Sequence, residues 1–349
     1  MSIEVIAVSP ANGLRAFNSF PRYIYGNRHR APSFPVLDRS KPGFDPLFGR
    51  VEAQPFLAVK DGRMAGRLAA GFHHALAGGE TGYFGYFESV NDRAVASALL
   101  ETAAKWLAAR GAGRVIGPVD LTPHERLGLL VEGFEGGHCP GMPYNPPFYA
   151  SLLTGCGLKT ETDLYAYRCN LPGGIPDKLA RVADRAGRIE GLRLRQVDFD
   201  NIAEEGEMFS RLHNESMSRI WGFVPLSPDE AAAIWKKLKG FCDPEVMLVA
   251  EVCGKAAGIC LALMPAGIGF FPASVRGAHV RLAVLSVLPA YRFKGIEALL
   301  IRECVKRVRK KGFAGMEFSQ VEKNNTMMKR IIESFGEAKR SRLYRIYRY

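Results

Sequence analysis

Apolar and polar positions alternate with period two along short stretches of the N-terminal half. Residues 55–60 and 65–70 are each typical of a strand, and the Asp61-Gly62 pair near their junction is a strong signal for a hairpin turn. The pattern then predicts, in order, a strand over 82–87, a helix over 92–110 that ends at Gly111, and a strand over 114–117. This half is therefore expected to be a compact mixture of strands and helices.

The C-terminal half repeats this order of elements. The pattern predicts a hairpin of strands 246–252 and 256–264 around Gly254-Lys255, a strand over 279–288, a helix over 295–311, a strand over 315–321 and a helix ending at Gly336. Arg and Tyr alternate over 340–349, which indicates a two-faced final strand. We therefore expect two α/β domains, 1–171 and 177–349, joined by the Pro/Gly-rich stretch 171–176.

One strand-to-helix junction in the C-terminal half differs from its N-terminal counterpart. The strand over 279–288 stops at Pro289, and a short turn with Arg292, Lys294 and Gly295 leads into the helix. Such a turn exposes unpaired backbone N–H groups, and the helix dipole adds partial positive charge, so it can hold a pyrophosphate. The counterpart, 88–92, has two acids and no glycine and favours a capped helix start. The alternative is a solvated turn that binds nothing.

This turn resembles the acyl-CoA-binding motif of the GNAT acetyltransferase superfamily, Arg/Gln-x-x-Gly-x-Gly/Ala. Arg292 and Gly295 match, whereas Glu297 stands where Gly or Ala is usual. The resemblance implies two tandem GNAT-like domains, each a mixed, mostly antiparallel sheet flanked by helices, with acyl-CoA bound as co-substrate in the second. It assigns to the cofactor site Leu285, Val287, Arg292, Phe293, Lys294, Gly295, Ile296 and Asn325.

The next helix departs from the superfamily in one respect. Asn325 suits the start of that helix as an N-cap, whether or not it contacts a cofactor. The superfamily often places a tyrosine in this helix as general acid towards the leaving thiolate. The corresponding position here is near Ile332, so that acid is missing or supplied elsewhere.

The middle of the chain resembles the bacterial ceramide synthase-like family. The segments that carry the resemblance are 117–118, 128–134, 142–149, 163–167, 221–225 and 342–347, and the block Met142-Pro143-Tyr144-Asn145-Pro146-Pro147 is the specific one. The resemblance covers nearly the whole chain. It implies transfer of a fatty acyl group from a thioester to the amine of a sphingoid base, although many members of the family have no assigned substrate.

Candidate chemistry gathers in this middle region. Prolines around Tyr144, Asn145 and Tyr149 stiffen a turn that could orient a substrate, although the same turn could simply cap a helix. His124 or Glu125 could remove the proton that an ammonium must lose before it attacks a thioester. No Ser-His-Asp or Cys-His arrangement is recognisable, which favours direct transfer without a covalent intermediate.

Composition and charge limit the classes of binding partner that we expect. The seven cysteines show no regular spacing and no metal or disulfide framework, and no N-terminal signal pattern is present, so a cytoplasmic protein without a metal is expected. The net charge is +12, and residues 302–349 carry fourteen Lys/Arg against five Glu, a net of +9. CoA phosphates, an acidic acyl carrier protein or an anionic membrane surface fit this basic segment, and nucleic acid fits it less well.

The stretch 256–275 has no charged residue, but its prolines and glycines argue against a membrane-spanning helix. We expect a strand followed by an apolar loop, in which Phe270 and Phe271 could contact a lipid substrate or the membrane. The expected protein is an acyl-CoA-dependent N-acyltransferase acting on a long-chain amine. A transferase for another amine, or a CoA- or lipid-binding protein without activity, remains an alternative.

Overall fold

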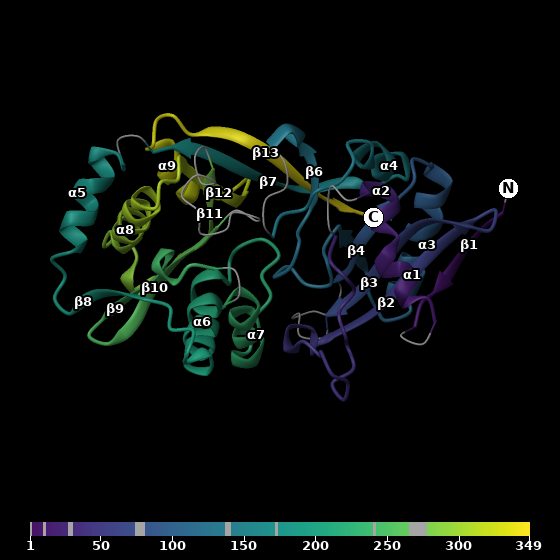
Figure 1. Ribbon diagram of the computed structural model, residues 1–349, viewed down its shortest axis with the longest axis horizontal. Coiled ribbons are helices and arrows are strands. Elements are labelled where there is room, and N and C mark those ends of the chain that lie inside the picture. Colours follow the sequence, from purple (N-terminus) through teal and green to yellow (C-terminus); the bar gives the residue numbers. More distant parts are fainter. Residues whose placement is uncertain are drawn as a thin grey trace. The chain divides into compact units, whose positions relative to one another are not determined.

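The computed structural model describes residues 2–9, 12–26, 31–73, 81–136, 141–171, 174–239, 242–264 and 278–349. The chain forms two compact units, each built of strands and helices (Figure 1). Unit 1 comprises Met1–Asp163 and Leu343–Tyr349, and unit 2 comprises Leu164–Arg342. The predicted class, a mixed and mostly antiparallel sheet flanked by helices, is confirmed.

Unit 1 is built on strands β1 (Ile3–Ala7), β2 (Val51–Lys60), β3 (Arg63–His73), β4 (Thr81–Ser89), β5 (Arg114–Gly117), β6 (Leu129–Glu132) and part of β7 (Lys159–Asn170). Its helices are α1 (Leu14–Ser19), α2 (Pro21–Tyr25), α3 (Arg93–Ala108) and α4 (Tyr149–Gly155), with short 3-10 turns at Pro46–Phe48 and Phe134–Gly136. The strands run in the order β1-β2-β3-β4-β5 and end on the final strand of the chain, β13 (Lys339–Arg348), which also pairs with β6. Strands β4 and β5 run parallel to each other, and the pairs of β2 with β1 and β3, of β3 with β4 and of β13 with β5 and β6 are antiparallel.

Unit 2 contains strands β8 (Leu192–Gln196), β9 (Met247–Val252), β10 (Lys255–Leu263), β11 (His279–Val287) and β12 (Gly315–Glu322). Its helices are α5 (Asp177–Ala186), α6 (Ile202–Met217), α7 (Pro228–Lys239), α8 (Ile296–Lys310) and α9 (Thr326–Glu333), with 3-10 turns at Pro244–Val246 and Pro289–Tyr291. The sheet order is β7-β12-β11-β10-β9-β8, and β11 and β12 form its parallel pair. The pairs of β12 with β7, β10 with β9 and with β11, and β9 with β8 are antiparallel.

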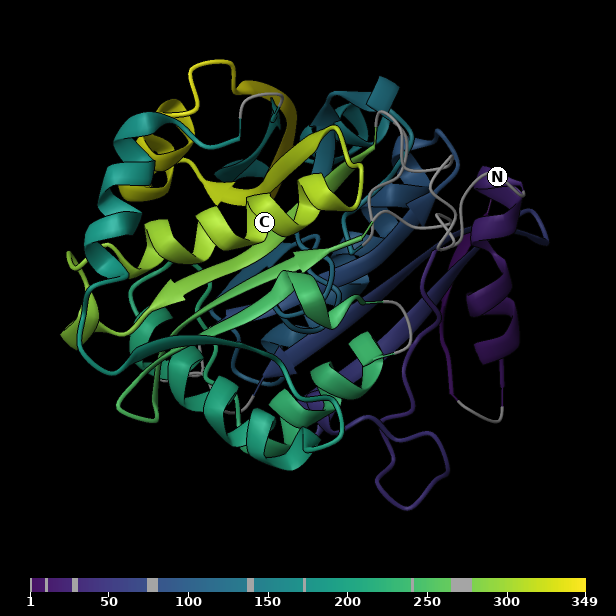
Figure 2. The same cartoon turned by 60° about the vertical axis from the view of Figure 1, so that its left-hand side comes forward.

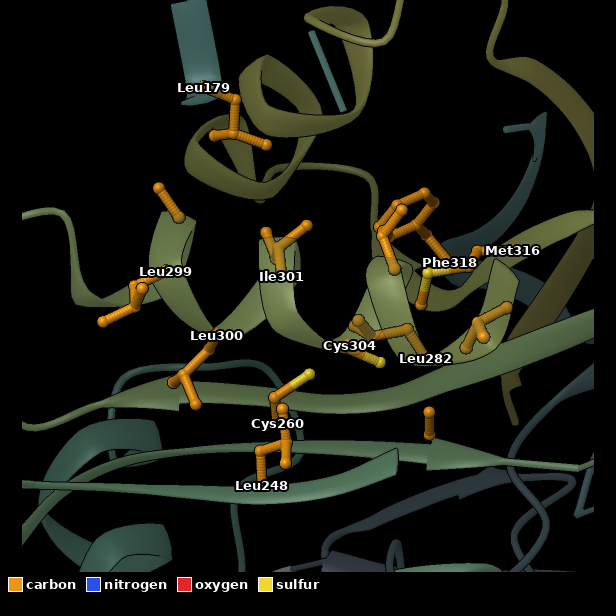
Figure 3. Close-up of a cluster of buried hydrophobic side chains, with 14 of the residues drawn as sticks. Leu179, Leu248, Cys260, Leu282, Leu299, Leu300, Ile301, Cys304, Met316 and Phe318 are labelled. Atoms are coloured by element: carbon orange, nitrogen blue, oxygen red, sulfur yellow. The ribbon is translucent and has the colours of Figure 1, made fainter. Parts of the chain in front are cut away.

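Helix α8 forms the centre of the unit 2 core. Its apolar residues recur every three or four positions, so one face packs on the sheet, and Figure 3 shows Leu300 and Cys304 directed at the strand that carries Cys260. Leu179 of α5 belongs to the same core and lies on the other side of α8 (Figure 3). Helices α6 and α7 pack on each other, and Figure 2 shows them apart from α8.

Both predicted hairpins are present, with one change in a turn. Asp61 and Gly62 have positive φ, 47° and 77°, which is the tight hairpin turn expected there. In the second hairpin the residues with positive φ are Cys253 (49°) and Gly254 (76°), and Lys255 already pairs with Val252. The turn is therefore Cys253-Gly254 and not Gly254-Lys255, because this turn type needs positive φ at both central positions.

The division between the units differs from the expected linker at 171–176. The chain passes from unit 1 to unit 2 between Asp163 and Leu164, within β7, and residues Leu343–Tyr349 return to unit 1. There Tyr347 pairs with Gly117 of β5, and Tyr349 N donates to Val115 O. Residues 172–173 of the expected linker lie outside the described residues.

A buried carboxylate joins three strands of unit 2. Glu317 on β12 is 1% exposed, and Arg168 Nε on β7 donates to its Oε2 at 2.8 Å. Arg342 Nη1, on the part of β13 that belongs to unit 2, lies 3.3 Å from the same oxygen. Arg342 is buried, with its side chain 2% exposed, so loss of the Glu317 carboxylate would remove a charge that compensates a buried cation.

Substituting Glu317→Ala is expected to lower the free energy of unfolding by about 3–5 kcal/mol, as for other buried ion pairs that lose one partner. Urea unfolding followed by circular dichroism would measure it. Glu333→Ala, at an exposed position at the end of α9, is the matched control and should change stability by no more than about 0.5 kcal/mol. Equal effects of the two substitutions would show that the Glu317 cluster does not stabilise the unit.

Candidate functional site

The parallel pair in unit 2 separates partway along its length. β11 pairs with β12 from His279 to Leu282, and beyond that point its residues pair with β10 alone among the strands of the described ranges. A bulge in the β10–β11 ladder lies at the same place, since Leu261 pairs with Val284 and Ala262 with Leu282. A bulge bends and re-aims a strand. Residues 283–285 are accordingly half-buried, between a buried Leu282 and a buried Ser286.

The turn that follows β11 holds a row of unpaired amides. After the 3-10 turn at Pro289–Tyr291, Phe293 and Gly295 adopt positive φ, 62° and 83°, and Gly295 is the N-cap of α8. Within the described residues, the backbone N–H groups of 293–298 donate to no acceptor, and the first bond at this end of the helix is Leu299 N to Gly295 O, 3.1 Å. Unpaired amides at a helix N-terminus favour an anion.

The side chains of this turn divide into two groups. Phe293 is 96% exposed, and the exposed Lys294 places its Nζ 5.3 Å from the centroid of the Tyr291 ring. The Arg292 guanidinium instead points into the protein, where Nη2 donates to Ser216 O at the end of α6 (2.7 Å) and Nε to Val287 O (3.3 Å). Arg292 therefore fixes the turn to α6 and β11, and Lys294 is the exposed cation of the motif.

Gly295 is constrained from two sides. Its φ of 83° disfavours any residue with a Cβ, and a Cβ built there would lie 2.7 Å from Val182 Cγ1 and 2.9 Å from Val182 O on α5. Ile296 is fully buried under the turn, and Glu297 in the first turn of α8 is half-buried. The acidic residue that the sequence singles out is thus near the unpaired amides but not at the exposed tip.

The helix that follows β12 is capped as expected. Asn325 Oδ1 accepts a hydrogen bond from Met328 N at 3.0 Å, so its oxygen serves the N-cap of α9. A cofactor contact from Asn325 stays a prediction. Ile332, at the position of the superfamily tyrosine, is 1% exposed and belongs to the core, so that position offers no acid.

At the corresponding strand-to-helix junction in unit 1, backbone N–H groups donate to acceptors within the protein. Val90 N donates to Ala65 O, and Asp92 caps α3 by accepting from Ala94 N. The parallel strands β4 and β5 also separate, but the chain after β5 fills the gap. Val119 N donates to Phe84 O at 2.7 Å, and Asp120 Oδ1 accepts from Tyr86 N at 2.7 Å. Within the part of unit 1 that the structure describes, this junction therefore has no comparable row of free amides for an anion.

The proline-stiffened turn of unit 1 lines a small cavity of about 30 Å³. Tyr144 and Asn145 are in its wall, together with Tyr25, Phe87, Glu88, Pro118, Asp120, Arg126, Gly128, Leu129 and Pro143. Asn145 is 5% exposed. Its side-chain Oδ1 accepts a hydrogen bond from Leu130 N (2.8 Å), and its Nδ2 donates to Leu130 O (3.1 Å). It aligns the turn with β6, and a role in substrate binding stays a prediction.

Tyr149 lies beneath this cavity, fully buried at the start of α4. Its hydroxyl donates to Glu88 Oε2 (2.9 Å) and accepts from Ser89 N (2.9 Å). His124 and Glu125 lie in the loop between β5 and β6, half-buried and outside the lining of the cavity. The structure thus brings Tyr144, Asn145 and Tyr149 together and leaves His124 and Glu125 apart from the cavity; catalytic roles for all of them stay predictions. Phe270 and Phe271 lie outside the described residues.

Glu88 is the residue that the sequence analysis did not single out. It ends β4, is 2% exposed, and accepts hydrogen bonds from Tyr25 (2.6 Å) and Tyr149 at one oxygen, Oε2. Burial raises the pKa of its carboxyl, and the positive charges of Arg67 and Arg126 and the two hydroxyls only partly offset that. An acid next to the start of a predicted helix looked like part of a cap, so no sequence signal separated it from Asp92.

The basic C-terminal segment is partly neutralised inside the units. Arg342 pairs with Glu317, Arg345 with Asp163, and Lys311 with Asp243 and Glu245. Among the helices of the described ranges, none is both long and apolar enough to cross a bilayer. In the same ranges, no three His, Cys, Asp or Glu side chains are placed to share a metal ion.

Residues 208–336 match the acetyltransferase (GNAT) family. The matched segment lies within unit 2. Over its full length the chain has the fold of a tandem GNAT protein from the clavulanic acid biosynthesis pathway, with a TM-score of 0.57, 13% identity and coverage of 100% of this chain and 98% of that one. A GNAT-family N-acetyltransferase from Sphaerobacter thermophilus has a TM-score of 0.53 at 16% identity, covering 99% and 95% of the two chains.

Two curated relatives extend the similarity beyond the GNAT domain. A bacterial ceramide synthase from Caulobacter vibrioides is 32% identical over 230 residues, which are 65% of this chain and 60% of that protein. Protein YghO from Escherichia coli is 27% identical over 367 aligned residues, 96% of this chain and 92% of its own length. The resemblances to the GNAT superfamily and to the ceramide synthase are thereby confirmed as resemblances.

Substituting Gly295→Ala is expected to destabilise unit 2 in two ways. A Cβ in a left-handed conformation costs about 1–2 kcal/mol, and the contact with Val182 adds about 1–3 kcal/mol of overpacking. Gly254→Ala is the control, because Gly254 has a similar φ of 76° but nothing within 4 Å of its Cβ position, so only the first cost applies. Chemical denaturation of both variants measures the difference, and equal losses would contradict the packing of α5 against the turn.

Proposed function

We propose that this protein is an acyl-CoA-dependent N-acyltransferase that joins a fatty acyl group to the amine of a long-chain base. The observation that carries the donor assignment is the row of unpaired amides at 293–298 beside the point where β11 leaves β12. A pyrophosphate would accept hydrogen bonds from these amides, and Lys294 would add charge. The ceramide synthase relative supports the acceptor, a sphingoid base.

The residues of β11 define what the donor site would do. Beyond Leu282 the strand has a partner on one side only, so a thioester lying along Leu285 and Val287 could accept a hydrogen bond from a backbone N–H as its carbonyl oxygen becomes negative. The amine nitrogen would attack the thioester carbon, the C–S bond would break, and the amine would lose its proton to a base as the thiolate departs. With Ile332 at the tyrosine position, solvent or a group outside α9 would protonate that thiolate.

Two other functions are each favoured by particular features of the protein. A transferase that acylates a different amine would use the same turn. So would one whose donor is an acyl carrier protein, because acyl-CoA and acyl carrier protein both carry a phosphopantetheine and negative charge that Lys294 could neutralise. A binding protein without activity is favoured by Glu297 beside the amides and by the missing tyrosine. A CoA-induced rise in thermal stability, worth about 2.7 kcal/mol at a hundredfold excess over the dissociation constant, argues for an intact donor site.

The exposed lysine of the turn gives a test of donor placement. Lys294→Glu should weaken CoA binding at least about tenfold, equivalent to about 1.4 kcal/mol, because it replaces attraction by repulsion at the proposed phosphates. Isothermal titration with CoA at fixed salt measures it. Lys255→Glu, an equally exposed lysine at the start of β10, should leave affinity within about twofold. Unchanged affinity in Lys294→Glu would place the donor elsewhere.

The transfer reaction is tested with acetyl-, octanoyl- and palmitoyl-CoA, each with and without a sphingoid base. We expect thiol release and an amide, identified by mass spectrometry, from the long-chain donor only when the base is present. Release with another amine would favour the wider transferase function. Protein that binds CoA but transfers to no amine, or that binds no CoA, would contradict the proposed acyl transfer.

A further inference from the structure

In unit 1, one carboxylate oxygen of the buried residue Glu88 accepts no hydrogen bond within the described residues. Glu88 holds both tyrosine hydroxyls at Oε2, from Tyr25 at 2.6 Å and Tyr149 at 2.9 Å. The cation nearest to Oε1 is Arg67, whose Nη2 is 3.8 Å away, beyond hydrogen-bonding distance. Oε1 is not among the fully buried side-chain atoms that lack a partner, so it is open to a hydrogen-bond donor that enters the cavity. A hydrogen bond to a charged group is stronger than one between neutral groups, which favours a cationic donor here.

Arg67 is held away from Glu88 by other contacts. Its Nη1 donates to Phe17 O at 3.1 Å, and its guanidinium lies 4.9 Å from the Phe17 ring centroid and 5.8 Å from that of Tyr86. Its Nε and Nη2 are buried and make no hydrogen bond. Arg126, the other cation, is bound to Asp120, with Nε 2.7 Å from Oδ2. Neither arginine therefore fills the hydrogen-bonding position at Oε1.

The cavity beside Glu88 has the walls that an alkyl ammonium needs. The Tyr25 and Tyr144 rings, 6.4 Å apart at 46°, form one side, and Phe87, Leu129 and Pro143 add apolar surface. Aromatic faces attract ammonium groups, and apolar walls suit the carbon that carries them. The volume of about 30 Å³ exceeds the roughly 10–15 Å³ that one water needs and is far below that of a drug-sized site, so only a small head group enters.

We propose that this cavity, the Glu88 pocket (Tyr25, Phe87, Glu88, Leu129, Pro143 and Tyr144), binds the primary ammonium head of a long-chain amine. The ammonium would donate to Glu88 Oε1 and lie against Tyr25 and Tyr144, with the alkyl chain leaving past Phe87 and Leu129. Naming this amine as the acyl acceptor rests on the proposed function; the binding itself does not. Glu88, Tyr25 and Tyr144 would contact the ligand, and Tyr149 would position Glu88.

Direct binding is the first test, with octylamine as the probe. Isothermal titration of the wild-type protein should detect binding, and Glu88→Gln should weaken it at least tenfold because the amide lacks the charge of the carboxylate. Glu4→Gln removes one acid from an exposed position on β1 of the same unit and should leave affinity within about twofold. Equal affinity of wild type and Glu88→Gln, both verified as folded by circular dichroism, would overturn the proposal.

Two analogues with the same chain test the shape and charge of the pocket. Octyltrimethylammonium keeps the charge but is too large for a cavity of about 30 Å³, and octanol fits but is neutral. Both should bind at least tenfold more weakly than octylamine. If octyltrimethylammonium bound as tightly as octylamine, the cation would have to lie outside the Glu88 pocket, and the proposal would be contradicted.

The pH dependence separates a contact with Glu88 from a structural effect. Burial raises the pKa of the Glu88 carboxyl, and the Tyr25 hydroxyl is among the groups that lower it; the other charged or titratable groups around it are Arg67, Arg126, Asp120, Tyr86 and Tyr149. Octylamine needs the ionised carboxylate, so binding should be lost as pH falls through this raised pKa. Tyr25→Phe should move that loss to higher pH, and Glu88→Gln should abolish it. A profile unchanged in both variants would refute the assignment.

Transfer assays distinguish this proposal from the proposed function. If the protein binds octylamine through Glu88 but acylates no amine, the pocket stands and the acyltransferase function fails. If the enzyme acylates a long-chain base with the same KM for the base in Glu88→Gln as in wild type, the function stands and the pocket is wrong. A raised KM for the base with an unchanged KM for acyl-CoA supports both.

Discussion

The donor site depends on how the backbone amides of unit 2 are paired. A strand in the middle of a sheet normally has partners on both sides, but β11 loses β12 after Leu282 and keeps only β10. Directly after the strand, positive φ at Phe293 and Gly295 brings the chain into α8 with its first N–H groups unbonded. Arg292 fixes this arrangement through Ser216 and Val287, and α5 packs against Gly295. Such a site is determined by backbone direction more than by any one side chain.

Unit 1 has the same order of strands, but the gap between its parallel strands β4 and β5 is filled by the chain itself. Gly85 allows the backbone of Val119 to come so close that a Cβ there would be 2.1 Å from Val119 O. Asp120 then accepts from Tyr86 N, which leaves the gap between β4 and β5 filled. The polar groups of unit 1 are concentrated instead around Glu88, below the turn that carries Tyr144 and Asn145. A duplicated fold therefore presents backbone donors in one copy and a buried carboxylate in the other.

Local signals in the sequence were enough for most of the elements and for the turn. The alternation of apolar residues located the hairpins and strands, and the glycine-containing turn pointed to α8, because both patterns reflect interactions between near neighbours in sequence. The unit boundary and the Glu88 pocket depend on residues far apart, such as Tyr25, Glu88 and Tyr149, or Tyr347 and Gly117. No spacing rule links those positions, so only the folded chain brings them together. Arg292 matched a motif, yet its side chain faces inward, because a motif specifies residue types and not rotamers.

The return of the last strand to unit 1 affects the order in which the protein can form during synthesis. Tyr347 pairs with Gly117 across 230 residues of sequence, and all of unit 2 lies between the body of unit 1 and Leu343. On the ribosome the first 163 residues emerge with the edges of β5 and β6 still open, since β13 has not been made. Such exposed edges are prone to pairing with other chains. Unit 2 can complete most of its sheet earlier, so unit 1, most of which is translated before unit 2, is completed after it.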